Sequence, residues 1–500
     1  MKTRVDEILH RRPAVGLALG VIRGGSLEFF HGHGVADIPT KTPVTEDTVF
    51  RIASITKTFT AIAIMQLWEQ GLVDLDAPAA DYLRAYRLIP AKPDWRPATV
   101  RHLLTHTAGI GELVSPSGLL RPDFGESVKP GRPVPSLAEY YRGALRIDAE
   151  PGTRFRYGDH SHATLGQIVA DVSGQSLDRY LREHLFGPLG MADTDLVPSE
   201  RVRSRLATGY RFGSGGAEAV PVRDWATGGA AAAYSTPRDM TRYLAALLGG
   251  GAGEHGSVLA ASTLATMFEP HYQPDPRIPG MGLTFFRRIT GGHLVAEHQG
   301  ILPGFDSQIV VAPEDGVAIM AFTNGATRAV LWLPGEMGNL LDDLLDIPHE
   351  TIRTDVPHRP DVWSDICGWY YLPGRLTDAR VRAMLGAGAE VFVRRGVIVL
   401  RFLTPVPALF RPLPLHPDDD TDPYAFRIEL PDGLGSFRVV FSRDPENGTR
   451  AVHFDIMPLS AEKRPASTNP RLWAEGAVAV AAAAILGRRR TRRRRRRAEH

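Results

Sequence analysis

The strongest constraint on the fold of this chain is a serine and a lysine placed three residues apart at the start of a long apolar segment. Ser54 and Lys57 precede the run from Thr58 to Trp68, in which apolar side chains recur near helical spacing until Gly71 ends the pattern. A serine hydroxyl is a poor nucleophile at neutral pH, and a lysine whose amine is desolvated is a base that can activate it. The pattern therefore predicts a helix that begins with a nucleophile and, one turn later, its base.

Serine and lysine at this spacing also occur by chance on exposed helices, so the segments around them decide the interpretation. Several of these segments resemble the serine β-lactamase and penicillin-binding-protein superfamily, closest to the class C β-lactamase-like esterases and D-aminopeptidases. The resemblance extends from about Ala14 to Gly325. The segments that carry it, besides the S-x-x-K motif, are Gly32–Asp37, Thr48–Ala53, Gly71–Pro78 and Val100–Ile110.

The second catalytic element of that superfamily is Y-x-N, and Tyr157-Gly158-Asp159 occupies its place. The resemblance implies that Tyr157 takes the proton of the serine and returns it to the leaving group. Asp159 stands where the family has asparagine. An ionised carboxylate there favours the charged form of Lys57, which makes the lysine a worse base and moves the proton transfer to Tyr157. The loss of an amide N–H donor favours ester or unusual amine substrates over β-lactams and peptides.

The third element of the superfamily is a strand that carries K-T-G or H-x-G, and His298-Gln299-Gly300-Ile301 fits the second form. The resemblance implies that His298 orients the substrate or Tyr157. Gly300 lets the strand backbone approach the substrate, because it carries no side chain. The backbone N–H groups of Ile301 and Ser54 would then form the oxyanion hole.

Closely spaced histidines raise the alternative of a metal site, which we discount. None of the pairs has a carboxylate at a recognised ligand spacing, and the single cysteine, Cys367, cannot build a thiolate site. The S-x-x-K mechanism also needs no metal, so we expect neither a metal nor another cofactor. The pairs concerned are His31 with His33, His102 with His106, and His160 with His162.

The chain has 500 residues, 43% of them hydrophobic, which is enough for a large core and more than one domain. Residues Met1 to Arg12 are charged and lack the apolar core of a secretory signal. We therefore expect a cytoplasmic protein. Such a protein meets small esters and amides of metabolism rather than cell-wall peptides.

The net charge of +2 conceals a basic C-terminal tail. Residues Arg488 to His500 contain nine arginines and one glutamate, a local charge of +8, so the preceding residues carry −6. The apolar segment before the tail, Leu472 to Gly487, is shorter than the ~20 residues that span a bilayer. One interpretation is a marginal membrane anchor at an anionic surface. The other, which we favour, is an Ala-rich segment followed by solvated arginines. No interleaved aromatic residues indicate a specific nucleic-acid site.

The pattern of the chain changes after a Pro-containing stretch. Residues 1–347 are assigned to the hydrolase domain, 348–361 to a linker, 362–460 to a small β-barrel that resembles lipocalins, and 461–500 to a disordered Ala-rich segment and Arg-rich tail. The fold class implied by the resemblance is α/β. It combines an antiparallel sheet flanked by helices, a mainly helical insertion, and the all-β C-terminal domain.

Two functions remain open from the sequence. The first is a serine hydrolase that forms an acyl-enzyme on small ester or amide substrates, with esterase activity favoured over β-lactamase or D,D-peptidase activity. Transfer of the acyl group to an alcohol or amine would use the same residues. The second is a non-catalytic ligand-binding or membrane-tethered protein with a degenerate site, which Asp159 favours and the retained Ser54, Lys57, Tyr157 and His298 disfavour.

Overall fold

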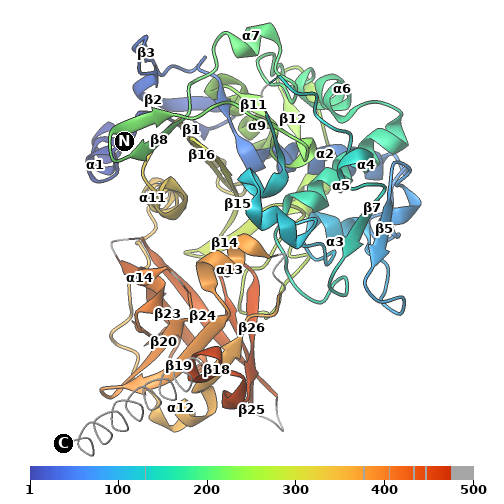
Figure 1. Ribbon diagram of the computed structural model, residues 1–500. Coiled ribbons are helices and arrows are strands. Elements are labelled where there is room, and N and C mark those ends of the chain that lie inside the picture. The colour runs from blue at the N-terminus through green and yellow to red at the C-terminus, as the bar shows by residue number, and fades with distance from the viewer. Residues whose placement is uncertain (130, 375–377, 405, 432–433, 445–447, 474–500) are drawn as a thin grey trace, which may run out of the picture.

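The computed structural model consists of an α/β part and an all-β part that lies against it (Figure 1). It describes residues 1–500 except 130, 375–377, 405, 432–433, 445–447 and 474–500. The Arg-rich tail and most of the apolar segment before it, for which a membrane anchor or disorder is expected, lie outside the described residues. Among the residues that are described, no helix combines the length and the apolar character needed to cross a bilayer.

The α/β part is built on one antiparallel sheet whose strands come from both ends of the first 323 residues. The late strands β14 to β17 lie side by side, and β17 pairs with β1 in register, Leu19 opposite Ala321. The order is β14 (Phe286–Thr290), β15 (His293–Leu302), β16 (Phe305–Ala312), β17 (Val317–Thr323), β1 (Gly16–Arg23), β2 (Ser26–Asp37) and β3 (Thr42–Pro43).

Helices cover both faces of this sheet because its central strands are apolar on both sides. In β17, Val317 and Ile319 pack with α1 (Lys2–Arg11) and α11 (Ala329–Leu344). Ala318 and Met320 point to the opposite face, because side chains alternate along a strand. There they pack with the larger helical layer of α2 (Thr56–Glu69), α5 (Asp159–Ser173) and α9 (Pro237–Leu248). The buried run of β17 is thus explained by two covered faces.

The insertion between β3 and β14 is mainly helical, as the resemblance implies. Its remaining helical elements are η1 (Ala53–Ile55), η2 (Ala79–Asp81), α3 (Val100–Leu104), η3 (Pro116–Leu120), η4 (Pro122–Gly125), α4 (Leu137–Tyr140), α6 (Leu177–Leu181), the π-helical turn η5 (Arg182–Phe186), α7 (Glu200–Arg203), α8 (Gly228–Ala231) and α10 (Ala261–Phe268). Its strands are short: β4 (Phe50–Arg51), β5 (Arg87–Pro90), β6 (Ser127–Val128), β7 (Ala144–Ile147), β8 (Tyr210–Gly213), β9 (Gly216–Ala219), β10 (Asp224–Trp225), β11 (Tyr234–Ser235), β12 (Ala252–Gly253) and β13 (Gly256–Ser257).

The all-β part is one antiparallel sheet that is nearly closed, because its two edge strands follow one another in the chain. The order is β21 (Leu413–Pro414), β20 (Val397–Phe402), β19 (Gly388–Arg394), β18 (Gly368–Tyr371), β26 (Leu459–Arg464), β25 (Gly448–Phe454), β24 (Ser436–Asp444), β23 (Ala425–Glu429) and β22 (His416–Pro417). The short helices α12 (Pro360–Ile366), α13 (Ala379–Leu385) and α14 (Pro407–Phe410) accompany it. We call this unit the barrel. Its last strand ends at Arg464.

The barrel is joined to the α/β part by buried contacts on the side of β14. Phe155 and Met281 of the α/β part belong to the same hydrophobic cluster as the barrel side chains Tyr370 and Leu400. The two parts therefore share an apolar seam.

One buried amide ties three segments of the α/β part together, and its loss gives a test of the fold. Asn324 Nδ2 donates to the carbonyl oxygens of Val35, Ala36 and Thr208 at 3.2, 3.0 and 2.9 Å. Asn324→Ala removes all three hydrogen bonds, so we expect the free energy of unfolding to fall by about 3 kcal/mol in urea denaturation. Ser26→Ala, which removes an exposed hydrogen bond of 3.4 Å, should change it by less than about 0.5 kcal/mol. Equal losses in both variants would contradict this account.

Candidate active site

The predicted nucleophile lies where strand β4 leads through η1 into helix α2. Ala53, the residue before Ser54, has a φ of 50°, a left-handed conformation that costs energy for a residue other than glycine. The Ser54 side chain is buried except for a small part, and Lys57 is fully buried. Lys57 Nζ donates a hydrogen bond of 2.8 Å to Ser54 Oγ. The structure thus brings the two residues together as the spacing predicts.

Lys57 is held as a cation by its surroundings. Its Nζ also donates to Asp159 Oδ1 at 2.6 Å and to the Ala230 carbonyl oxygen at 3.1 Å. Burial by itself lowers the pKa of Lys57, but Asp159 and Tyr157 more than offset this and raise the pKa above its usual value. An ammonium that donates to Ser54 Oγ cannot at the same time accept the proton of that hydroxyl. The effect expected of Asp159 on Lys57 is therefore present in the geometry.

Tyr157 lies beside this ion pair. Lys57 Nζ is 5.0 Å from the centre of the Tyr157 ring, close enough for its charge to act on the ring. His106 packs on the same ring with a centroid distance of 4.5 Å. Ser54, Lys57, Tyr157 and Asp159 thus gather around one point, between the start of α2 and the start of α5.

His298 comes to the same region on strand β15 and is almost completely buried. Its Nδ1 is 2.8 Å from the Gln299 carbonyl oxygen, which assigns the proton to Nδ1. Its Nε2 has no hydrogen-bond partner among the described residues. Burial and the charge of Lys57 lower the pKa of His298 to about 3, so the ring is neutral at physiological pH. Phe286 packs against both His298 and Tyr157, at centroid distances of 5.6 and 6.1 Å.

Strand β15 approaches the nucleophile most closely at Gly300. The pairing of β15 with β14 ends at Glu297, so the following residues are no longer paired with β14. A Cβ atom at Gly300 would lie 2.3 Å from the Ile52 carbonyl oxygen and 3.1 Å from Ala53 Cβ. Only glycine fits this contact. An oxyanion hole formed by the N–H groups of Ser54 and Ile301 requires such a close approach of strand β15 to the start of η1. That these two N–H groups are the donors remains a prediction.

Two further histidines, which the sequence suggested only as unlikely metal ligands, belong to this site. His106 lies between Tyr157 and His162, with a ring distance of 4.7 Å to the latter. His162 Nε2 is 2.8 Å from Thr284 Oγ1. The backbone is left-handed at His106 and Thr284, with φ of 56° and 76°, and such strained residues concentrate at functional sites. In the sequence, the left-handed turn at His106 carries no signal that distinguishes it from scaffold.

The described residues contain no group of three or more His, Cys, Asp or Glu side chains arranged to hold a metal ion. The histidines of these pairs make ring contacts and hydrogen bonds with protein groups, such as that between His160 Nδ1 and Tyr141 Oη at 3.0 Å. His31 and His33, for example, stack along β2 at 6.4 Å.

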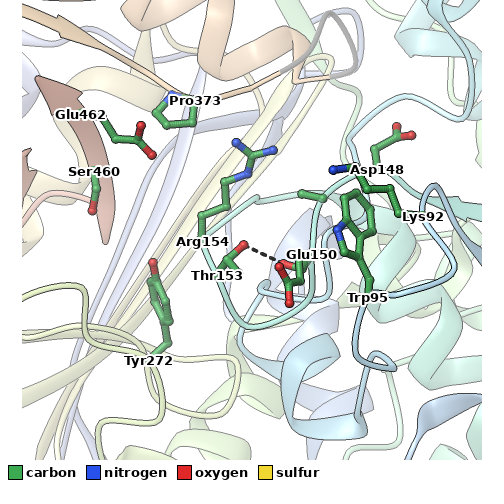
Figure 2. A pocket seen from close by; sticks show the side chains of 11 residues that line it. Lys92, Trp95, Asp148, Glu150, Thr153, Arg154, Tyr272, Pro373, Ser460 and Glu462 are labelled. Atoms are coloured by element: carbon green, nitrogen blue, oxygen red, sulfur yellow. Dashed lines mark hydrogen bonds between the residues drawn. The ribbon is translucent and has the colours of Figure 1, made fainter. Parts of the chain in front are cut away.

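A separate pocket of about 380 Å³ lies at the seam between the two parts (Figure 2). Figure 2 shows Arg154 reaching into it between Lys92 and Trp95 on one side and Glu462 of the barrel on the other. Arg154 Nε has no hydrogen-bond partner among the described residues. None of the predicted site residues lines this pocket, so it is distinct from the Ser54 centre and is linked to it through the loop from Arg154 to Tyr157.

The buried neutral histidines make stability depend on pH. Burial lowers the pKa of His106 and His162 well below the usual value. Below about pH 6.5 the unfolded chain therefore binds protons that the folded protein does not. As the pH is lowered further, the free energy of unfolding decreases by about 1.4 kcal/mol per pH unit for each such histidine.

His106→Phe should reduce this slope, because both ring nitrogens of His106 lack a hydrogen-bond partner among the described residues and an apolar ring can replace them. Urea denaturation between pH 4.5 and 6.5 measures the slope. Replacing the exposed His349 by Phe is the matched control and should leave the slope nearly unchanged. An unchanged slope in His106→Phe would mean that His106 is charged in the folded protein.

The chain is similar to known proteins of one family. The Beta-lactamase family profile matches residues 1–334. The chain is 30% identical over 341 residues to penicillin-binding protein 4 of Amycolatopsis lactamdurans, covering 64% of this chain and 84% of that protein. It is 32% identical over 222 residues to esterase EstB of Burkholderia gladioli, covering 44% of this chain and 55% of that protein. The chain thus spans only about half the length of the esterase.

A solved structure extends the likeness of fold to the barrel. The octameric penicillin-binding protein homologue from Pyrococcus abyssi has a TM-score of 0.58 at 23% identity, covering 92% of this chain and 99% of that one. The expected antiparallel sheet flanked by helices and the all-β C-terminal region are therefore confirmed. Because the family profile matches two thirds of this chain, the chain belongs to the beta-lactamase family, a family of serine hydrolases.

Proposed function

We propose that the protein is an esterase-like hydrolase that acts on small ester or amide substrates through an acyl-enzyme on Ser54. The observation that carries the proposal is the buried hydrogen-bonded series from Ser54 Oγ to Lys57 Nζ to Asp159 Oδ1, at 2.8 and 2.6 Å. Burying a lysine and a carboxylate is costly unless both are paired. A pocket that only binds a ligand has no need of this pair directly behind a serine hydroxyl.

In the proposed reaction, Tyr157 acts as the general base and acid. Tyr157 acts in its phenolate form, which the positive charge of Lys57 stabilises. The phenolate oxygen takes the proton of Ser54 Oγ as that atom attacks the substrate carbonyl carbon, and Tyr157 becomes a neutral phenol. The N–H groups of Ser54 and Ile301 bind the oxyanion, and each such donor is typically worth about 3 to 4 kcal/mol.

The tetrahedral intermediate collapses when the bond to the leaving group breaks and Tyr157 returns its proton to the departing oxygen or nitrogen. Water then attacks the acyl-enzyme, and Tyr157 accepts a proton from the water. As the bond between the acyl carbon and Ser54 Oγ breaks, Tyr157 returns this proton to Ser54 Oγ, which releases the acid and regenerates the enzyme. An alcohol or amine in place of water gives acyl transfer with the same residues. His298, neutral and with its Nε2 available, is proposed to orient the substrate.

Asp159 supports an ester preference over a β-lactam or peptide preference. An ionised carboxylate accepts hydrogen bonds and cannot donate one to an amide side chain of the substrate. The likeness to esterase EstB points in the same direction, whereas the likeness to penicillin-binding protein 4 leaves amide substrates open.

The first test is covalent labelling. A fluorophosphonate probe should add to the wild-type protein at one site, detected by intact mass, and Ser54→Ala should abolish the adduct because the attacking oxygen is gone. The exposed Ser117 provides the control: Ser117→Ala should label like the wild type. Absence of any adduct on correctly folded wild-type protein would favour the non-catalytic binding protein instead.

A second test addresses the substrate class. Asp159→Asn removes the carboxylate that raises the pKa of Lys57 and restores an N–H donor, so turnover of a chromogenic cephalosporin should rise relative to that of a p-nitrophenyl ester. We expect the ratio to rise by about fivefold to tenfold, because a hydrogen bond from the restored amide to the amide side chain of the cephalosporin contributes about 1 to 1.5 kcal/mol and the p-nitrophenyl ester has no such group.

The control for this test is Asp6→Asn, which removes the acid of an exposed lysine ion pair, Lys2–Asp6 at 2.7 Å. It should leave the ratio unchanged. A ratio in Asp159→Asn equal to or below that of the wild type would remove Asp159 as the source of the ester preference.

A further inference from the structure

The loop that carries Tyr157 lies between the α/β part and the barrel. Phe155 is 4% exposed and belongs to the hydrophobic cluster formed by the barrel interior, against which Tyr157 also packs. On its other side, Tyr157 packs on His106. The catalytic tyrosine proposed above is therefore held between His106 and an apolar cluster that the α/β part and the barrel share.

Arg156, between these two aromatic residues, joins the parts through its backbone and its side chain. Its backbone N–H donates to the His106 carbonyl oxygen at 2.7 Å, and its Nη1 donates to the Gly109 carbonyl oxygen at 2.7 Å. On the barrel side, Nε and Nη2 donate to Asp378 Oδ1 at 2.9 and 2.6 Å. Asp378 immediately precedes α13 of the barrel.

This ion pair is shielded from water. The side chains of Arg156 and Asp378 are 2% and 12% exposed, so solvent cannot replace either partner without the loop or the barrel moving. A buried ion pair that loses one partner leaves a charge without compensation, which strongly favours rearrangement. The residue next to Arg156 in the chain is Tyr157, so a rearrangement here changes the placement of the phenol relative to Ser54.

We propose that the barrel is part of the catalytic unit, with Asp378 as a positioning residue that fixes the Tyr157 loop through Arg156. The proposal rests on the function proposed above, because it assumes that Tyr157 transfers the proton of Ser54. Asp378 itself touches neither Ser54 nor Lys57 in the described contacts, so the positioning proposed here is transmitted through Arg156. The barrel is thus needed for catalysis, beyond any role in substrate access.

The alternative is that the Arg156–Asp378 pair only holds the two parts together. A second ion pair across the same seam separates these roles. Arg277 Nη1 donates to Asp422 Oδ2 of the barrel at 2.8 Å, with side-chain exposures of 28% and 24%. Among the described hydrogen bonds of Arg277 and Asp422, none involves residues 153–158. Asp422→Asn therefore removes an ion pair across the same seam without touching Arg156.

The test compares Asp378→Asn, Asp378→Glu and Asp422→Asn in the full-length protein. We expect Asp378→Asn to lower the rate of fluorophosphonate labelling and kcat for a p-nitrophenyl ester by about tenfold to a hundredfold with KM nearly unchanged, because small displacements of a catalytic group have effects of that size. Asp378→Glu keeps the charge and should recover most of the rate. Asp422→Asn should label at the wild-type rate.

Hydrogen exchange supplies a readout that does not depend on activity. In Asp378→Asn, exchange at residues 153–158 should speed up at least tenfold, since the Arg156 N–H bond to His106 is then less protected. In Asp422→Asn, exchange in this segment should match the wild type.

The outcomes separate the two proposals. Wild-type labelling at Ser54 combined with unchanged labelling and exchange in Asp378→Asn would overturn the positioning role alone. An equal loss of labelling in Asp378→Asn and Asp422→Asn would reduce the pair to a purely structural one. If the wild type does not label at all but exchange is still faster in Asp378→Asn, then Asp378 does restrain the Tyr157 loop, but the proposed hydrolase function is wrong and the positioning role in catalysis is wrong with it.

Discussion

The buried ion pair between Lys57 and Asp159 is the interaction on which the site depends. Lys57 stands in the first turn of α2 and Asp159 is the first residue of α5, so the pair joins the helix that presents the nucleophile to the helix that follows Tyr157. Both charges are buried, and each would be strongly destabilising without the other. The pair therefore fixes the distance between the two helix starts, and with it the placement of Ser54 relative to Tyr157.

The surroundings of this pair explain why so many strained and unsatisfied groups occur together. Left-handed residues at Ala53, His106 and Thr284 are all completely buried, so the packing around them holds their strained conformations in place. His106 and His298 are kept neutral by burial and by the nearby charge of Lys57. A neutral imidazole adds no second positive charge beside the lysine. The site therefore concentrates its positive charge at one atom, next to the serine hydroxyl.

Much of the fold and of the site could be predicted from the sequence because each motif is local. Ser54 and Lys57 are one helical turn apart, and Tyr157 and Asp159 sit together at a helix start, so their relative placement follows from short stretches of chain. Strands β16, β17 and β20 contain short runs of apolar and β-branched residues, which are typical of strands, so these elements also have a local pattern. The roles of Asp378 and His106 could not be predicted, because neither has a local pattern that marks it.

The sequence by itself determined the fold family, the identity of the proposed nucleophile and its neighbours, and the change from a mixed α/β pattern to short strands after residue 361. The tertiary structure decided that Lys57 is protonated and how the α/β part and the barrel meet. The charge of a lysine depends on its burial and on Asp159, 102 positions away in the chain. The contact of Arg156 with Asp378 spans 222 positions. Such interactions arise only when distant segments are brought together and water is excluded, so no local pattern of residues encodes them.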